Sequence, residues 1–376
     1  MTNCYICDTP LTLENSSKEH ILLNSIGGHL KSKDLLCNIC NSKFGHEADT
    51  ELANQLLFLS SYLNVKRDSG KNQIIKGAKT EDGREYHIDG DRPIHSKPNF
   101  KKKVEGGETK YLISARTEKE LLNILKGLRK KHPELDLEVA KQKFQWKEEY
   151  LNEHLSNEIT IGGDLAFISI VKTAVDYYIL TANEKEQVKH LFEYLKGNEK
   201  LNIIKHYYPT KPIYKKDTNE IVHLIHLRGN KYSKLLFCFI EFFSSYSFLI
   251  ILSDKYEGKN ISSTYCYDVL KSQVVEKQVK LKLEKEAINI TSKICQNDFT
   301  TITNKLSRVL DIANKIKSDK EISNIIQKTI NKVFYQYKNE TKFTEQMIHE
   351  LSKEISLAYV KFAFRGKRKT QTLDEW

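Results

Sequence analysis

The chain opens on Cys4-Tyr-Ile-Cys7, and a second pair, Cys37-Asn-Ile-Cys40, follows shortly after it. Each Cys-x-x-Cys pair forms a tight turn that aims two thiolates at one point, and two such pairs can close around one tetrahedral Zn²⁺. The segment between the pairs is too short to bury a hydrophobic core of its own. Bound zinc is therefore expected to replace that core and to hold a small, loop-rich module together.

The residues between and after the cysteine pairs predict a ββα arrangement. Glu19-His-Ile-Leu-Leu23 is typical of a short strand, Gly27-Gly28 of a turn, and Asp34-Leu-Leu-Cys37 of a second strand. A helix is expected to begin at Asn41 and to continue through Leu56. We refer to residues 1–65, which should form this zinc-stapled module, as the finger.

The order of these motifs resembles the HNH (ββα-metal) endonucleases, in the subgroup whose finger is braced by four cysteines. The resemblance covers about residues 1 to 55 and rests on Cys-x-x-Cys, Glu-His-Ile, Gly-Gly and Cys-x-x-Cys-Asn in this order, with an aspartate downstream. It implies a metal-dependent endonuclease that hydrolyses phosphodiester bonds of DNA and leaves 5′-phosphate and 3′-hydroxyl ends. The layout as a whole, a cysteine-braced finger ahead of a long mixed domain, is similar to that of bacterial nucleases, some of which serve antiviral defence against foreign DNA, and such a role is a further expectation.

The same resemblance assigns roles to individual residues. His20 is the general base, and Glu19 and Asn41 hold the catalytic divalent ion. For a further ligand of that ion, His46 and Asp49 are the alternatives. The structural zinc is bound by Cys4, Cys7, Cys37 and Cys40.

The chemistry of these residue types suits that assignment. A neutral imidazole takes a proton from water near neutral pH. Mg²⁺ or Mn²⁺ prefers oxygen ligands and can neutralise a phosphate and its leaving oxygen, whereas thiolates select Zn²⁺. Two separate metals, a structural zinc and a catalytic Mg²⁺ or Mn²⁺, are therefore expected.

Two other classes of function stay open at this point. The finger can be a structural zinc knuckle in a non-catalytic protein that binds nucleic acid or an effector. Alternatively, the C-terminal helices can hold a latent nuclease inactive until a partner or ligand arrives.

Composition and charge favour a globular protein that approaches a polyanion. The 376 residues are 39% hydrophobic, and 60 Lys and Arg against 49 Asp and Glu give a formal net charge of +11. By the HNH resemblance, this polyanion is expected to be DNA, double-stranded in particular. Three further cysteines, Cys238, Cys266 and Cys295, stand singly, and no signal peptide precedes Cys4, so a reducing cytoplasm is expected.

The whole chain is predicted to be α+β. The finger is expected at 1–65, a mixed α/β region with an antiparallel sheet at 66–205, a β-rich core at 206–273 and a helical region at 274–376. The C-terminal helices offer a surface for a homo-oligomer or a partner protein. The basic and aromatic stretch that ends at Lys369 can contact nucleic acid or lie free in solvent.

Several segments carry specific structural predictions. Thr117 begins a capping box ahead of a helix to about Lys131, and Leu135–Val139 alternates as a strand does. The apolar segment Leu165–Leu180 suits a buried helix, and 184–196 an amphipathic one. The apolar window 235–252 is interrupted by polar residues and is therefore expected to be two buried strands joined by a turn.

Overall fold

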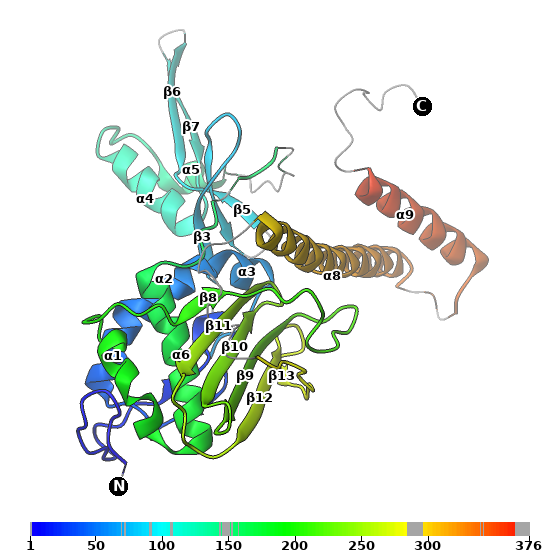
Figure 1. Ribbon diagram of the computed structural model, residues 1–376. Helices are drawn as coiled ribbons and strands as arrows, with labels where there is room; N and C mark the ends of the chain where they lie inside the picture. Colours follow the sequence, from blue (N-terminus) through cyan, green and yellow to red (C-terminus); the bar gives the residue numbers. More distant parts are fainter. Residues whose placement is uncertain are drawn as a thin grey trace. The chain divides into compact units, whose positions relative to one another are not determined.

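The computed structural model of the chain describes residues 2–68, 70, 73–89, 92–105, 108–142, 144, 151, 153–156, 158–283, 296–338, 340 and 342–364. Two compact units are present (Figure 1). The first comprises Met1–Ile75, Asp89–Asp91 and Glu158–Ile312, and the second Lys76–Ile88, Arg92–Asn157 and Ala313–Trp376. The division of the chain into four regions stays a prediction, because these units follow contacts in space rather than the order of the chain.

An antiparallel sheet forms the centre of the first unit. Within the described residues it has six strands, in the order β13-β12-β9-β10-β11-β8. The bounds of these strands are β8 (Ile204–His206), β9 (Val222–Asn230), β10 (Leu235–Phe242), β11 (Tyr246–Ser253), β12 (Ile261–Asp268) and β13 (Gln273–Val274). The β-rich prediction is thus confirmed, and the window 235–252 is two buried strands joined by a turn.

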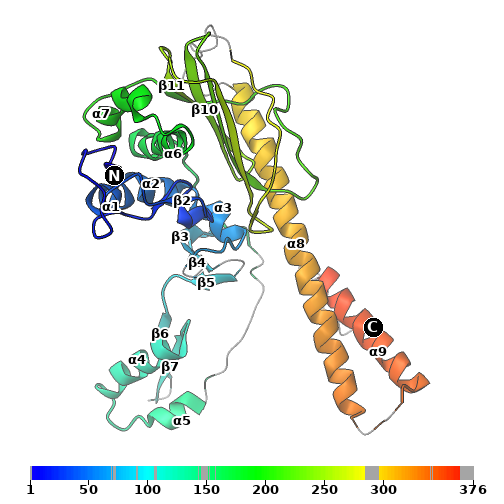
Figure 2. The ribbon, with the colours of Figure 1, turned by 90° about the horizontal axis from the view of Figure 1, so that it is seen from below.

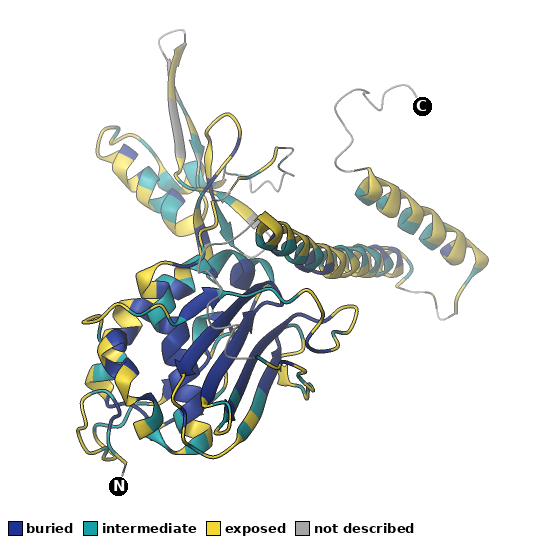
Figure 3. Ribbon diagram, in the orientation of Figure 1, coloured by how far each residue is buried: buried dark blue, intermediate teal, exposed yellow. Residues whose placement is uncertain are grey.

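Both faces of this sheet are buried at the central strands β10 and β11 (Figure 3). Side chains that alternate along β10 enter two different cores: Leu236 and Ile240 face the finger and α6 (Asp164–Ala182), whereas Phe237 faces the loop residues Ile213 and Leu281. Because successive residues of a strand point to opposite faces, a strand covered on both sides must be apolar throughout. This explains the continuous hydrophobic run that marks β10 and β11.

Helix α6 is the buried helix predicted for Leu165–Leu180. It begins after Gly163 and ends at Asn183, whose left-handed backbone (φ 56°) terminates the helix. By length and composition α6 could cross a membrane, but 67% of its apolar window is buried inside the protein, as in a core helix. Figure 2 shows α6 between the finger helices and the sheet. The segment after α6, predicted as one amphipathic helix, is a 3-10 helix η2 (Lys185–Leu191) followed by α7 (Phe192–Leu195).

The finger contains a two-residue hairpin and three short helices. Its elements are β1 (Glu19–His20), the 3-10 helix η1 (Asn24–Ile26), β2 (Lys31–Ser32), α1 (Asn38–His46), α2 (Ala48–Gln55) and α3 (Leu57–Tyr62). The ββα order is as predicted, and the pairing joins Glu19 with Ser32 and His20 with Lys31.

Three boundaries in the finger differ from the prediction. The second strand was expected at Asp34–Cys37 but lies at β2, because Leu35 and Leu36 are both buried and cannot alternate between two faces of a hairpin. The first strand is limited to Glu19–His20. The helix begins before Asn41, since the Cys37 side chain accepts the backbone N–H of Cys40 and thereby caps α1.

Small sheets and helices follow the finger along the chain, and most of their residues belong to the second unit. The strands are β3 (Ile74–Lys79), β4 (Glu85–Asp89), β5 (Arg92–His95), β6 (Asn99–Glu105) and β7 (Glu108–Ser114). As predicted, Thr117 caps the helix α4 (Glu118–Arg129) through a bond from the Glu120 N–H (3.2 Å). The strand predicted at Leu135–Val139 is wrong: Asp136 accepts the N–H groups of residues 138 and 139 and starts the helix α5 (Leu137–Gln142).

The C-terminal region is helical, as predicted, but its start at residue 274 is wrong: residues 273–274 are strand β13, and the described residues 275–283 form no helix. Helix α8 (Gln296–Gln336) begins in the first unit, where Ile302 and Val309 join the core, and α9 (Glu345–Ala363) lies in the second. Lys332 of α8 pairs with Glu354 of α9 at 2.8 Å. Cys295 and the basic stretch from residue 365 to Lys369 lie outside the described residues. These features confirm the predicted α+β class.

Candidate metal centre and catalytic pocket

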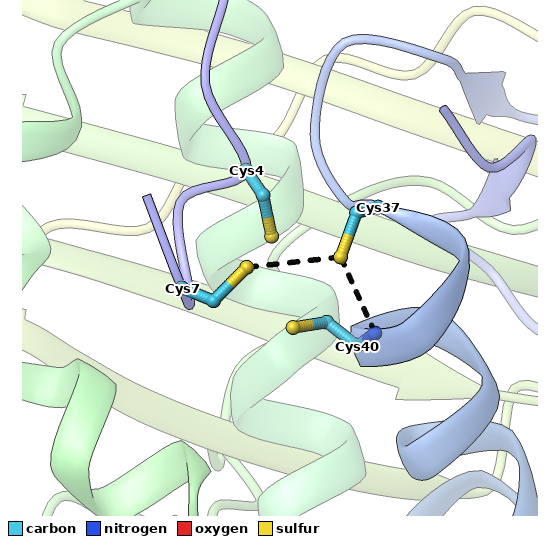
Figure 4. Close-up of side chains that lie close together, drawn as sticks. All are labelled: Cys4, Cys7, Cys37 and Cys40. Atoms are coloured by element: carbon cyan, nitrogen blue, oxygen red, sulfur yellow. Dashed lines mark hydrogen bonds between the residues drawn. The ribbon is translucent and has the colours of Figure 1, made fainter. Parts of the chain in front are cut away.

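The four finger cysteines converge on one point (Figure 4). Their sulfur atoms all lie within 4.8 Å of one another, and Sγ of Cys7 is 3.7 Å from Sγ of Cys37. Zn–S bonds of about 2.3 Å in a tetrahedron separate the sulfurs by roughly 3.8 Å. The cluster therefore fits the predicted zinc ion, for which Cys4, Cys7, Cys37 and Cys40 would be the ligands.

A pocket opens in the finger beside this cluster. Its volume is about 230 Å³. The predicted residues Glu19, His20, Asn41 and Asp49 all contribute to its wall. The full lining is Glu19, His20, Leu23, Asn24, Ser25, Asn41, Gly45, Asp49, Thr50 and Ala53. The fold thus brings together side chains from β1, α1 and α2.

Two carboxylates of the pocket share a lysine from α6. The Lys172 ammonium, fully buried, donates to Oε1 of Glu19 and lies 3.0 Å from Oδ2 of Asp49. Ser169, one turn earlier in α6, donates to Oδ1 of Asp49 at 2.6 Å. Glu19 is only 2% exposed, so without a cation its charge would be costly to bury.

Burial and charge act in opposite directions on these groups. Desolvation raises the pKa of Glu19, and the attraction of Lys172 opposes that rise. Desolvation alone would lower the pKa of Lys172, but the neighbouring carboxylates raise it well above its usual value. The lysine therefore stays protonated at neutral pH and is a permanent positive charge beside the pocket.

A third acidic side chain near Lys172 is Asp176 of α6. It is fully buried, and its Oδ2 lies 3.9 Å from the Lys172 ammonium, beyond hydrogen-bond distance. Burial raises the pKa of Asp176 to about 8. Asp176 is therefore mostly protonated at neutral pH, and the Lys172 ammonium is shared by the two carboxylates of the pocket, Glu19 and Asp49.

Asn41 presents an oxygen to the pocket. Its Nδ2 donates to Oγ of Ser17 at 2.5 Å, which leaves the carbonyl oxygen Oδ1 as the group that can bind a cation. Ser17 lies just before β1, so the loop that leads into the first strand fixes the amide at the start of α1. Carboxylate and amide oxygens on one pocket are a donor set that suits Mg²⁺ or Mn²⁺.

His20 is held by an aspartate that follows the finger. Nε2 of His20 lies 3.3 Å from Oδ2 of Asp68, which also pairs with Lys31 at 2.5 Å. In the tautomer whose Nε2 carries the hydrogen and donates a hydrogen bond to Asp68, Nδ1 is the basic atom of the ring. Burial, and then the charge of Lys31, lower the pKa of His20 below its ordinary 6.5, so the ring is neutral at pH 7.

The structure separates the two alternatives for a further ligand. Asp49 lines the pocket, whereas His46 is exposed at the C-terminal end of α1 and is absent from the pocket wall described above. Two histidines three residues apart in β9 are bonded to protein groups instead of a metal site: His223 contacts the Ile26 carbonyl and His226 the Thr264 hydroxyl.

Sequence reasoning missed Lys172, Ser169 and Asp68. Lys172 and Asp176 do leave a signal, because two charged residues one turn apart in an otherwise apolar helix need buried partners. Asp68 leaves none, since an exposed aspartate in a loop is ordinary.

A cysteine cluster on a ββα hairpin, next to a pocket with a histidine and oxygen donors, defines the class of zinc-braced ββα-metal fingers. Residues 4–57 match the family model of the HNH endonucleases. The N-terminal segment is therefore an HNH endonuclease domain, and this indicates a nuclease with a nucleic-acid substrate. No curated protein and no solved structure gives a significant match to the chain.

Proposed function

We propose that this protein is a metal-dependent HNH endonuclease that hydrolyses phosphodiester bonds of DNA, with His20 as general base. The observation that supports it most directly is the pocket that gathers His20, Glu19, Asn41 and Asp49 next to the cysteine cluster. A divalent ion bound there would neutralise charge on the phosphate and the leaving oxygen.

Each side chain of the pocket would have a separate role in the reaction. Nδ1 of His20 takes a proton from the attacking water, while Asp68 holds the Nε2 side of the ring. Oxygens of Glu19, Asn41 and Asp49 would hold the ion. By the HNH resemblance, the products carry 5′-phosphate and 3′-hydroxyl ends.

Several finer points belong to the same proposal. The formal charge of +11 supports a polyanionic substrate, which we propose is double-stranded DNA. The finger offers little surface to read bases, so sequence choice would come from residues outside it. We further propose a cytoplasmic protein that acts in antiviral defence, with the C-terminal helices α8 and α9 as the surface for self-association or a partner.

The test is plasmid cleavage by the full chain in Mg²⁺, Mn²⁺ and EDTA. His20→Ala should lower the rate by about 10²–10⁴-fold, because proton transfer by a positioned base contributes that much. His349→Ala, which removes an exposed histidine from α9, is the matched control and should cleave normally.

Two results would contradict the proposal. Equal cleavage by wild type and His20→Ala would show that His20 is not the general base. DNA binding by both proteins without cleavage in either metal would favour the non-catalytic zinc knuckle instead. Cleavage that appears only after α9 is removed would identify a latent nuclease.

A further inference from the structure

Lys172 is a buried charge that the proposed mechanism does not use. It belongs to α6, far along the chain from the HNH domain, and its side chain is fully buried. Its ammonium contacts Glu19 from β1 and Asp49 from α2, and it lies over the ring of Phe44 from α1, 5.4 Å from the centroid. One side chain therefore touches three elements of the finger.

The lysine lies behind the carboxylates, on the protein side. Glu19 and Asp49 line the pocket, whereas Lys172 is not part of the described pocket wall. Each contact engages one oxygen, Oε1 of Glu19 and Oδ2 of Asp49. Ser169 also donates to Oδ1 of Asp49, but each carboxylate oxygen can accept more than one contact, so the ammonium can stay in place while a second cation approaches the same carboxylates from the pocket.

Lys172 contacts the acids that line the pocket more closely than the acid on its own helix. Asp176, one turn away on the same helix, is the local acid for Lys172, yet its nearest oxygen is 3.9 Å from the ammonium. The distance to Asp49 is 3.0 Å, and the contact with Glu19 is closer still. A lysine whose role was only to neutralise its own helix would pair with Asp176.

We propose that Lys172 is a positioning residue of the nuclease site, supplied by α6 to orient Glu19 and Asp49 for the catalytic ion. This inference rests on the proposed function. It means that the HNH domain does not contain its whole site, because Lys172 and Ser169, which orient both carboxylates, come from outside residues 4–57.

The experiment measures Mn²⁺ binding to the full-length, zinc-loaded protein by electron paramagnetic resonance of the free ion. It needs no turnover. Lys172→Met keeps the length and apolar stem of the side chain and removes the charge. Its Mn²⁺ affinity should fall about 10- to 100-fold, the usual effect of removing a group that orients metal ligands.

The matched control is Lys216→Met, which removes another lysine bonded to a buried acid, Glu241 at 2.5 Å, in the same unit. This variant should bind Mn²⁺ as wild type does. Zinc content and circular dichroism of each variant show whether the fold is retained.

Ser169→Ala is a second variant for the case that Lys172→Met does not fold. It removes only the hydrogen bond to Asp49 and should weaken Mn²⁺ binding several-fold. Wild-type affinity in a folded Lys172→Met, or tighter binding, would overturn the inference, as would an unaffected Ser169→Ala if Lys172→Met is unfolded.

Different results would contradict the proposed nuclease function and the proposed role of Lys172. A wild-type protein that binds no Mn²⁺, or whose Mn²⁺ binding is unchanged in Asn41→Ala, would contradict the proposed function itself. Mn²⁺ binding that needs Asn41 but not Lys172 would contradict only the role of the lysine.

Discussion

Two histidines of the first unit have different environments and therefore different roles. His20 is partly exposed in the pocket and has a charged partner in Asp68. His223 is fully buried: its Nε2 donates to the carbonyl of Ile26 at 3.0 Å, and its Nδ1 accepts the N–H of Phe243 at 3.3 Å. It thus joins the 3-10 helix η1 to the sheet as a neutral ring.

The burial of His223 predicts a pH dependence of stability. Burial lowers its pKa in the folded protein to about 3, from 6.5 in the unfolded chain. Above pH 6.5 the ring is neutral in both states, and the stabilisation is fully present. As the pH falls from 6.5 towards 3, the His223 ring becomes protonated in the unfolded chain but stays neutral in the folded protein. The free energy of unfolding therefore decreases.

Denaturant unfolding of wild type and His223→Gln between pH 7 and pH 4 measures this effect. Glutamine keeps a donor and an acceptor but does not titrate, so the decrease should be smaller in the variant. Protonation of the zinc-binding cysteines affects both proteins alike. It therefore cancels when the free energy of unfolding of the variant is subtracted from that of wild type at each pH. Parallel curves would show that His223 does not titrate as expected.

Asp68 gives a second prediction at this scale. Asp68→Asn keeps the shape but removes the charge that faces His20 and Lys31. We expect a several-fold lower kcat with unchanged Mn²⁺ affinity, because Asp68 contacts the base and none of the proposed ion ligands. A loss of Mn²⁺ affinity equal to the loss of rate would place Asp68 with the ion instead.

At the scale of the element, the hairpin depends on a close approach of backbone at its turn. Gly27 has a left-handed backbone (φ 89°) and ends η1. A Cβ atom at Gly28 would lie 1.8 Å from the carbonyl oxygen of Leu22. Only glycine fits there without movement of the chain, and this turn sets the pairing that places Glu19 and His20 at the pocket.

Gly28→Ala should therefore destabilise the finger strongly, by several kcal/mol, because backbone rather than a flexible side chain must move. Thermal unfolding of the zinc-loaded variant measures this. Gly45→Ala is the matched control, since a Cβ there meets nothing within 4 Å. A melting temperature of Gly28→Ala equal to that of Gly45→Ala would refute the prediction.

At the scale of the molecule, the finger shares its core with the rest of the first unit. Leu52 of α2 and Leu56, which follows this helix, belong to the same buried cluster as Ile170 of α6 and Ile240 of β10. Gln55 also exchanges two hydrogen bonds of 2.8 Å with the backbone of residue 162, just before α6. The finger is therefore docked, and its loss would expose apolar surface on α6.

This shared core predicts the effect of zinc removal. Because zinc stabilises the finger, and the finger covers α6, a chelator should lower the melting temperature of the whole first unit rather than only loosen the N-terminus. Calorimetry with and without the chelator tests this, with readdition of Zn²⁺ as the control. An unchanged transition in zinc-free protein would show that the finger is energetically separate.

The sequence by itself determined the local chemistry of the finger. The cysteine spacing, Glu19-His20 and Asn41 identify the zinc cluster and the pocket residues, since zinc knuckles and ββα turns depend on short-range spacing. The apolar runs likewise predict the buried strands β10 and β11 and the core helix α6. Short segments were less predictable: capping by Asp136 outweighed the alternation at Leu135–Val139, so a helix forms where a strand was predicted.

Only the tertiary structure decided what surrounds that chemistry. The contact of Lys172 with Glu19 joins residues far apart in the chain, and so does the contact of Asp68 with His20. No periodicity or spacing records such pairs, because they depend on how α6 and the loop after α3 pack against the finger. A buried charge must find its partner in three dimensions, and the folded chain alone shows which carboxylate that partner is.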